Sequence, residues 1–406
     1  MKRQYVTVFP GRRDQYQIPV ALAENGRLAG FATCFYWRRG IIGRIPAFAG
    51  ILGQRRADGV DEKKVDCMEF TNIAARVGRR MMQPSKVGVW EDGAFARKAV
   101  ALARRRQASL LLYEFQAEWA FRQTLRPGSV RILFQFHPHP ALEHPLLLAD
   151  GERYPQFLPG IRRNTRMNLA GFYRRHTCGA WRNADHVIAA SRFTARSLEI
   201  AGCPGSRITV IPYGCDMGRI AGPSKGKPPI KRPYFLFVGS GTHRKGLHHL
   251  IEAWTRSHVS ATHELVVIAR VVDRELIESL ATSKSVRHMP GVRASELSRW
   301  YASALAFVLP SLSEGFGHVY LEALACGCPV IGTRNSMLPD FPEAQRHVLY
   351  VEPGEPDSIR AGIERVAGFP AEDPFFRTEA VRESVKAYTW ERFRGGVELV
   401  LAGFDR

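Results

Sequence analysis

Short apolar runs alternate with segments of helical periodicity in the second half of the chain, and this alternation constrains the fold most. Residues 234–239, 263–269, 305–309 and 329–332 are short and largely apolar, which predicts buried strands. Apolar side chains recur at helical spacing in residues 247–256, 294–303 and 318–325, which predicts helices between those strands. Strands that are apolar on both faces are typical of a parallel sheet covered by helices on each side, so we predict an α/β fold.

The first half alternates in the same way, with longer excursions between strands. We predict strands at residues 5–9, 31–37, 110–115, 132–137, 186–190 and 208–211. A helix at 93–106 would place Phe95, Ala99, Leu102 and Ala103 on one side and its basic residues opposite. Residues 38–90 show no pattern that assigns an element. The chain has 406 residues, enough for two cores, and residues 217–233 are rich in Gly, Pro and Lys, as in an interdomain linker.

The apolar runs, the N-terminus and the cysteines indicate the cellular compartment. No run of 18 apolar residues occurs, so we expect no membrane-spanning helix. The N-terminus passes from two basic residues directly into a predicted strand, without the core of a signal peptide. The seven cysteines are odd in number and scattered. We therefore expect a cytoplasmic protein with reduced thiols.

Residues 310–329, PSLSEGFGHVYLEALACGCP, carry the strongest functional signal. They follow a predicted strand, and ligands bind at the carboxyl ends of strands in open α/β sheets. Glu314 falls in the loop and Glu322 in the first turns of the next helix, while Gly315 and Gly317 allow close approach to a ligand. An arbitrary glutamate pair is usually a solvated surface feature. The strand, the glycines and the helix start occur together here, which favours a site for sugar hydroxyls and phosphate.

A basic turn, VGSGTHRKG at 238–246, gives the second signal. Arg244 and Lys245 lie between a predicted strand and a predicted helix, where two cations can neutralise a diphosphate. Taken alone, the turn is better interpreted as a solvated loop. The glutamate segment beside it favours a diphosphate site, and the spacing is not that of a P-loop.

Together these segments resemble the retaining glycosyltransferases of family 4 (glycosyl transferases group 1). The resemblance covers about residues 184–400 and is carried by 184–216, by FVGSGTHRKGLHHLIEAW, by EGFGHVYLEALACGCPVI and by YTWERF at 388–393. It implies the GT-B fold, two Rossmann-like domains with parallel sheets facing a central cleft. Residues 1–216 would form the acceptor domain, 234–387 the nucleotide-sugar domain, and 388–406 a helix crossing back to the first domain.

The resemblance also implies a donor site. Glu322 would hold the nucleotide ribose, and Glu314 would contact the transferred sugar. Lys245 would hold the diphosphate. The other donor-binding positions implied are Gly291 and Val292 beside the base, and Gly315, Phe316, Gly317, His318 and Val319 through their backbone.

Two positions depart from the family pattern. Ser240 follows Gly239 where many members have an arginine, and we expect Arg244 to take over that role. The double glycine that the family has near the N-terminus is missing, and Gly11, in Pro10-Gly11-Arg12-Arg13-Asp14, is our candidate for the same close approach to the donor.

A histidine pair follows the predicted strand 132–137 in ILFQFHPHP. The family often places a histidine after a strand of the N-domain, facing the transferred sugar, so His137 is our catalytic candidate beside Glu314, with His139 as the alternative. A structural or surface histidine is the competing interpretation. His137, His139 and His144 lack an accompanying Asp, Glu or Cys cluster, and the family needs no catalytic metal, so we expect neither metal nor cofactor.

The net charge and its distribution indicate which partners the protein binds. The net charge is +20, and residues 1–210 contain 34 Lys and Arg against 16 Asp and Glu. In residues 160–182 arginines alternate with aromatic side chains, which favours contact with an anionic membrane surface, although a solvated face is the competing interpretation. No standard nucleic-acid-binding motif occurs, so we do not expect nucleic acid.

The sequence therefore predicts an enzyme that moves a hexose-type sugar from a UDP- or GDP-linked donor to a glycan or polyprenyl-diphosphate-linked acceptor. It would act peripherally at the inner face of the cytoplasmic membrane, in cell-surface polysaccharide synthesis. Three alternatives remain: a sugar-nucleotide epimerase, a hydrolase on the same fold, and an inactive homologue that binds the donor.

Overall fold

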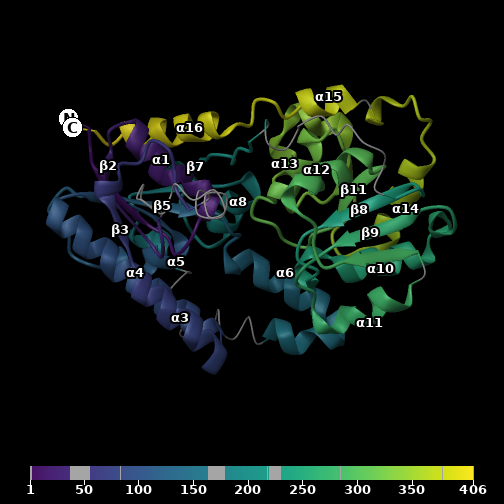
Figure 1. The fold of residues 1–406 in the computed structure, drawn as a ribbon, viewed down its shortest axis with the longest axis horizontal. Helices are drawn as coiled ribbons and strands as arrows, with labels where there is room; N and C mark the ends of the chain where they lie inside the picture. The colour runs from purple at the N-terminus through teal and green to yellow at the C-terminus, as the bar shows by residue number, and fades with distance from the viewer. Residues whose placement is uncertain are drawn as a thin grey trace, which may run out of the picture.

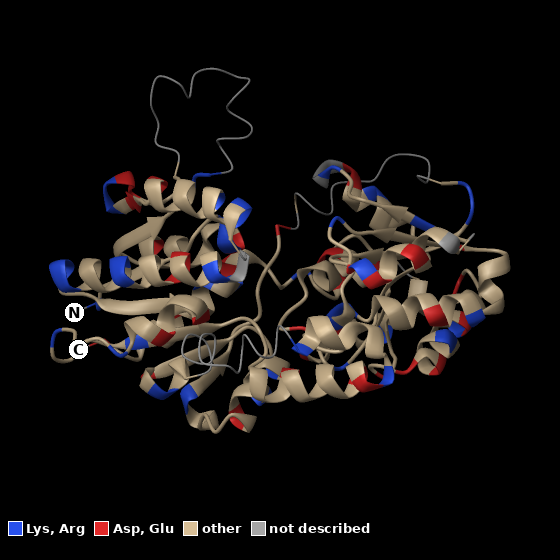
Figure 2. Cartoon of the chain, turned by 90° about the horizontal axis from the view of Figure 1, so that it is seen from below, with Lys and Arg blue, Asp and Glu red and all other residues tan. Residues whose placement is uncertain are grey.

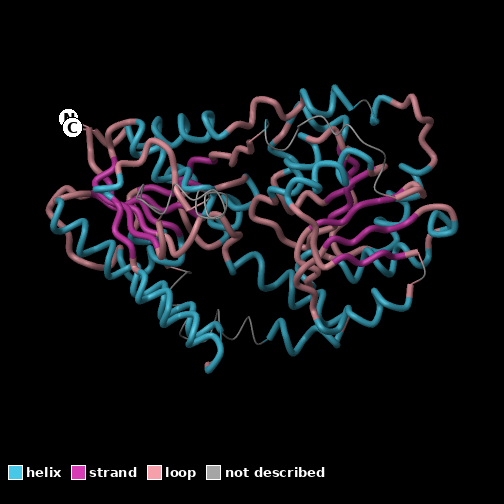
Figure 3. The backbone as a smooth tube through the Cα atoms, in the orientation of Figure 1, coloured by secondary structure: helices cyan, strands magenta, loops and turns pink. Residues whose placement is uncertain are grey.

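Two lobes lie side by side along the long axis of the molecule (Figures 1 and 2). The computed structural model describes residues 2–36, 55–82, 84–162, 179–216, 218, 230–283, 285–376 and 378–405. In each lobe, helices surround a central sheet (Figure 3). The predicted α/β class with two Rossmann-like domains is confirmed.

The sheet of the first lobe has seven parallel strands in the order β3-β2-β1-β4-β5-β6-β7. Its strands are β1 (Tyr5–Val8), β2 (Leu28–Thr33), β3 (Val65–Cys67), β4 (Ser109–Tyr113), β5 (Arg131–Gln135), β6 (His186–Ala189) and β7 (Ile208–Val210). The predicted strand 31–37 is wrong in its bounds, since β2 begins at Leu28 and ends at Thr33. The prediction for 132–137 extended too far, because β5 ends at Gln135.

The sheet of the second lobe has six parallel strands in the order β10-β9-β8-β11-β12-β13. They are β8 (Tyr234–Val238), β9 (Glu264–Ile268), β10 (Val286–Met289), β11 (Ala306–Leu309), β12 (Val330–Gly332) and β13 (Val348–Tyr350). Four of the six were predicted. Because all are parallel, the loops after β8 and β11, which are neighbours, leave the sheet at the same edge.

Helices cover both sheets. They are α1 (Gln17–Glu24), α3 (Glu69–Met81), α4 (Pro84–Arg106), α5 (Glu114–Ala120), α6 (Pro140–Arg153), α8 (Arg192–Ile200), α10 (Leu247–Arg256), α11 (Arg274–Thr282), α12 (Ala294–Ser303), α13 (His318–Ala325), α14 (Pro356–Ala367), α15 (Thr378–Glu383) and α16 (Trp390–Ala402). The predicted bounds of α10, α12 and α13 are confirmed. Helix α4 starts earlier than predicted and buries Phe95, Ala99, Leu102 and Ala103, as its periodicity requires.

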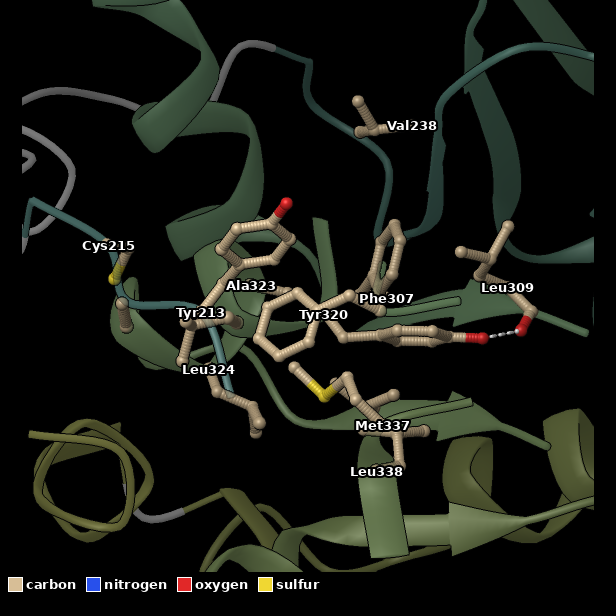
Figure 4. Packing of buried hydrophobic residues seen from close by; sticks show 14 of the residues in the cluster. Tyr213, Cys215, Val238, Phe307, Leu309, Tyr320, Ala323, Leu324, Met337 and Leu338 are labelled. Carbon is tan, nitrogen blue, oxygen red and sulfur yellow. Dashed lines mark hydrogen bonds between the residues drawn. The ribbon is translucent and has the colours of Figure 1, made fainter. Parts of the chain in front are cut away.

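The helix that follows the glutamate loop is fixed by its buried side. Tyr320 of α13 is fully buried, and its hydroxyl donates to the carbonyl oxygen of Leu309 at 2.6 Å. Phe307, Met337 and Leu338 pack around the ring (Figure 4). This anchorage holds the start of α13 against the carboxyl end of β11, where the candidate site lies.

The last helix, α16, packs on α1 of the first lobe. The buried Arg27 pairs with Glu398 and Asp405, both at 2.6 Å, and so ties the C-terminal end of the chain to the beginning. Most of residues 217–233 lie outside the described residues, so the domain boundaries remain predictions. The six described cysteines are free thiols, and Cys178 lies outside the described residues.

Candidate active site

Two loops at the carboxyl edge of the second sheet bring the basic turn and the glutamate loop together. Lys245 forms an ion pair with Glu314, and both residues are 8% exposed. The guanidinium of Arg244 donates to the carbonyl oxygen of Ser313 at 2.8 Å and lies 3.6 Å from the Glu314 carboxylate. Segments that are separated by about 70 residues in the sequence thus form one polar centre of two cations and one carboxylate.

Burial governs the charge on Lys245. Removal from water lowers its pKa well below the usual range, and the neighbouring Arg244 lowers it further. An anion beside the ammonium group favours the charged form. The site is therefore electrostatically suited to a ligand that brings negative charge to the end of β8.

Glu322 does not share that ion pair. Its carboxylate accepts a hydrogen bond from the hydroxyl of Tyr301 on α12 at 3.4 Å, and burial raises its pKa. A carboxylate with one long hydrogen bond can still accept hydroxyl groups from a ligand.

The glycines of the glutamate loop explain how closely the lobes approach. A Cβ atom at Gly315 would overlap the carbonyl oxygen of Phe136 and lie 3.0 Å from the Cα of His137. The carbonyl oxygen of Gly315 also accepts hydrogen bonds from the hydroxyls of Ser191 and Thr194 in the first lobe. Only glycine permits this contact between the glutamate loop and the end of β5.

His137 lies at that contact. Its imidazole Nδ1 is hydrogen-bonded to the buried carboxylate of Glu114, and 41% of the His137 side chain is exposed. Glu114 follows β4, the neighbour of β5, and also accepts from the side chain of Gln135. His139 is instead buried, and its ring accepts from the backbone N–H of Ala141 at 3.1 Å, so it caps α6. Of the two histidines, only His137 has a partly exposed side chain, and its backbone lies at the lobe contact.

The loop after β1 carries Gly11 in a left-handed conformation, with φ of 109°. Asp14, Gln15 and Tyr16 follow, also with positive φ, which is rare for residues other than glycine. Asp14 accepts from the Tyr213 hydroxyl at 2.7 Å, and Arg13 lies 3.7 Å from the centroid of the Phe136 ring. Burial raises the pKa of Asp14, an effect that Arg13 opposes. The sequence had indicated no role for Arg13, Asp14 or Tyr213.

The remaining predicted donor positions lie around this centre. Phe316 and His318 place their rings 5.2 and 4.8 Å from Tyr213, and burial lowers the pKa of His318 to about 4, so its ring is neutral at pH 7. Val319 follows in the first turn of α13. Gly239 and Ser240 follow β8, with open space beside the Gly239 Cα.

Gly291 and Val292 follow β10, two strands away from β8. Gly291 has a φ of 149°, and a Cβ atom there would lie 3.8 Å from the Arg270 side chain. Because β10 is parallel to β8, both loops leave the sheet at its carboxyl edge.

A second interlobe cluster, missed by sequence analysis, adjoins the basic turn. Asp150 on α6 accepts from the Nε2 atoms of His243 and His249 at 2.7 Å and of His248 at 3.0 Å. Burial would raise the pKa of Asp150, but these hydrogen bonds lower it below its usual range. Within the described residues, Asp150, His243 and His248 have the grouping that could hold a metal ion, although their separations also suit hydrogen bonds. Through His243, next to Arg244, the cluster holds the basic turn against the first lobe.

Comparison with known proteins covers both lobes. The model of "Glycosyltransferase Family 4" matches residues 54–219, and that of "Glycosyl transferases group 1" matches residues 222–368. The sequence is 31% identical over 160 residues to an uncharacterized glycosyltransferase of Methanocaldococcus jannaschii, covering 38% of this chain and 41% of that protein. It is 31% identical over 201 residues to a putative colanic acid biosynthesis glycosyltransferase of Escherichia coli, covering 47% and 48%. The matched stretch thus spans less than half the length of each relative.

The fold has counterparts among solved structures. An α,α-trehalose-phosphate synthase (UDP-forming) from Burkholderia vietnamiensis superposes with a TM-score of 0.67 at 13% identity, over 99% of this chain and 98% of that one. Among the described residues, no helix is both long and apolar enough to cross a bilayer.

Proposed function

Because the chain belongs to glycosyltransferase family 4, we propose that it transfers a hexose-type sugar, with retention of anomeric configuration, from a UDP- or GDP-linked donor to a hydroxyl acceptor. One observation carries the proposal: Lys245, Arg244 and Glu314 converge at the carboxyl edge of the second sheet, and the next residue, Gly315, lies against the backbone of Phe136 and His137 in the first lobe. Cations beside a carboxylate suit a diphosphate joined to a sugar, and a second group across the contact suits the reacting sugar.

The donor would bind mainly to the second lobe. Lys245 and Arg244 would stabilise the charge that develops on the departing diphosphate, since fixed cations in a buried site need no rearrangement during the reaction. Glu322 would accept the ribose hydroxyls, and Glu314 would hold the transferred sugar. We do not assign Glu314 as a nucleophile, because its carboxylate is engaged by Lys245.

The acceptor would bind at the first lobe. His137 is partly exposed and held through Nδ1 by Glu114, so its Nε2 edge is the one left to face a sugar. The colanic acid relative supports a glycan or polyprenyl-diphosphate-linked acceptor in cell-surface polysaccharide synthesis. The excess of basic residues in the first half supports work at the inner, anionic face of the cytoplasmic membrane.

Product analysis tests this function. The protein is incubated with UDP- and GDP-linked hexoses, with and without acceptor lipid extract, and the products are followed by proton NMR. We expect nucleoside diphosphate release that depends on acceptor, and a first product with the anomeric configuration of the donor. Conversion of donor without acceptor would instead identify an epimerase or hydrolase, and donor binding without conversion an inactive homologue.

A further inference from the structure

Helix α3 carries its apolar side chains on the outside of the molecule. Phe70, Ile73, Val77 and Met81 recur at helical spacing, and they are 89%, 58%, 51% and 80% exposed. We call these four residues the apolar stripe. Ala75 is the buried residue of α3, and Gly78 faces Val87 of α4, so α3 is attached to the protein through another side. Figure 1 shows α3 and α4 as a pair at the margin of the first lobe.

Basic residues flank the apolar stripe. At 100° per residue, Arg76 and Arg80 lie next to the stripe on the side away from Ala75. Both are exposed, and neither forms an ion pair with another described residue. Arg79 differs, because it is bound to Glu91 of α4. Residues 69–106 contain nine Lys and Arg against three Asp and Glu, and basic residues mark the outer helices of this lobe (Figure 2).

We propose that α3 docks on an anionic lipid membrane, with the apolar stripe inserted at the headgroup boundary and Arg76 and Arg80 beside the lipid phosphates. The proposal rests on the membrane-associated part of the proposed function. An apolar stripe of about three turns with a basic flank is the pattern of helices that lie in the plane of a membrane interface. Aqueous proteins rarely leave such a stripe exposed without a partner.

This surface differs from the segment 160–182, which the sequence suggested. Residues 163–178, which include Arg163, Arg166, Arg174 and Arg175, lie outside the described residues. The 93–106 part of α4 buries its apolar side in the first lobe and exposes no large apolar side chain. Among the described helices, α3 exposes the most large apolar side chains, and basic residues flank them.

Vesicle sedimentation tests the proposal. The full chain is mixed with phosphatidylcholine vesicles that contain or lack phosphatidylglycerol. One variant combines Phe70→Ser, Ile73→Ser and Met81→Ser, a second combines Arg76→Glu and Arg80→Glu, and a matched control combines Val271→Ser and Ile277→Ser, exposed apolar residues of the second lobe. We expect binding to require phosphatidylglycerol, to weaken more than about tenfold in the first two variants, and to persist in the control.

Two results would overturn the proposal that α3 docks on the membrane. Either the wild type fails to bind vesicles at low salt, or both α3 variants bind as tightly as the wild type. Self-association of the wild type that the serine variant abolishes, without vesicle binding, would show that a second copy covers the stripe. Nucleoside diphosphate binding is measured in parallel: it should be equal in all variants, and its absence from the wild type would count against the proposed function alone.

Discussion

Gly315→Ala should separate the two lobes at the site without removing any charged group. The added Cβ would overlap the carbonyl oxygen of Phe136, a backbone atom that no rotamer change can move away. The φ of Gly315 is not in the left-handed region, so the effect is steric and not a matter of backbone preference. The glutamate loop must withdraw from the end of β5.

The withdrawal has an estimable cost. The Gly315 carbonyl oxygen loses the hydroxyls of Ser191 and Thr194, the second at 3.1 Å. At about 1 kcal/mol for each hydrogen bond, the closed contact becomes less favourable by about 2 kcal/mol, which corresponds to roughly 30-fold. Lys245 and Arg244 belong to the second lobe and keep their positions, so nucleoside diphosphate affinity should change little.

Steady-state kinetics and calorimetric titration of the nucleoside diphosphate separate these effects. We expect kcat to fall roughly 30-fold while the Kd changes less than about threefold. Gly395→Ala is the control, because Gly395 lies in α16 with open space where its Cβ would be. Unchanged kcat in a folded Gly315→Ala protein would refute the idea that the reaction uses this contact. An equal loss of donor affinity would show that the substitution disrupts the glutamate loop itself.

Three further outcomes are expected. Glu322→Ala should weaken donor binding roughly ten- to 150-fold, the worth of charge-assisted hydrogen bonds, and calorimetry showing a change within about twofold would remove Glu322 from the site. His137→Ala should lower kcat far more than donor affinity, whereas His139→Ala should lower the melting temperature because it uncaps α6; the reverse pattern would contradict the assignment. Burial lowers the pKa of His144 and of His248 to about 4, so between pH 6.5 and 4 the unfolded chain binds protons that the folded chain excludes. The contribution of these two rings to stability should therefore fall as the pH drops through that window, whereas the raised pKa values of Asp92 and Asp340 act in the opposite direction, so urea unfolding of the wild type is compared with that of a His144→Asn, His248→Asn variant. Parallel pH profiles of the two proteins would show that these rings are not buried neutral.

Helix and strand bounds were predicted best where a single hydrophobic periodicity dominates the segment. Helices α10, α12 and α13 have clear apolar sides, and their bounds were predicted. Strand β10, VRHM, mixes polar and apolar residues at the edge of the sheet, so it lacks the apolar run that identifies a central strand. In the first lobe the long run LAGFATCFYW is apolar except for Thr33, so pattern alone could not show that β2 occupies its beginning.

Some residues of the candidate site could likewise be predicted from the sequence, and others could not. Lys245 and Glu314 were predictable because each follows a buried strand, and adjacent parallel strands end at one edge. Glu114 is a charged residue directly after the apolar run LLLY, so its position was an equally good indication of the site. It was nevertheless not predicted as a site residue. Asp150 and its three histidines come from different lobes, and a contact between lobes has no local pattern in the sequence. Helix α3 was not predicted, although four apolar residues recur in it at helical spacing, and the sequence could not show that this apolar side faces outward.

Calorimetric titration of wild type and Lys245→Ala with UDP, GDP and the corresponding nucleosides tests the central claim most directly. Lys386→Ala is the control, because Lys386 is largely exposed and far from Lys245 in the sequence. If the loops after β8 and β11 form a diphosphate site, the wild type binds at least one nucleoside diphosphate, Lys245→Ala weakens that binding roughly tenfold or more, and nucleoside binding is nearly unchanged. Failure of the wild type to bind either diphosphate, or equal losses for diphosphate and nucleoside, would contradict the claim.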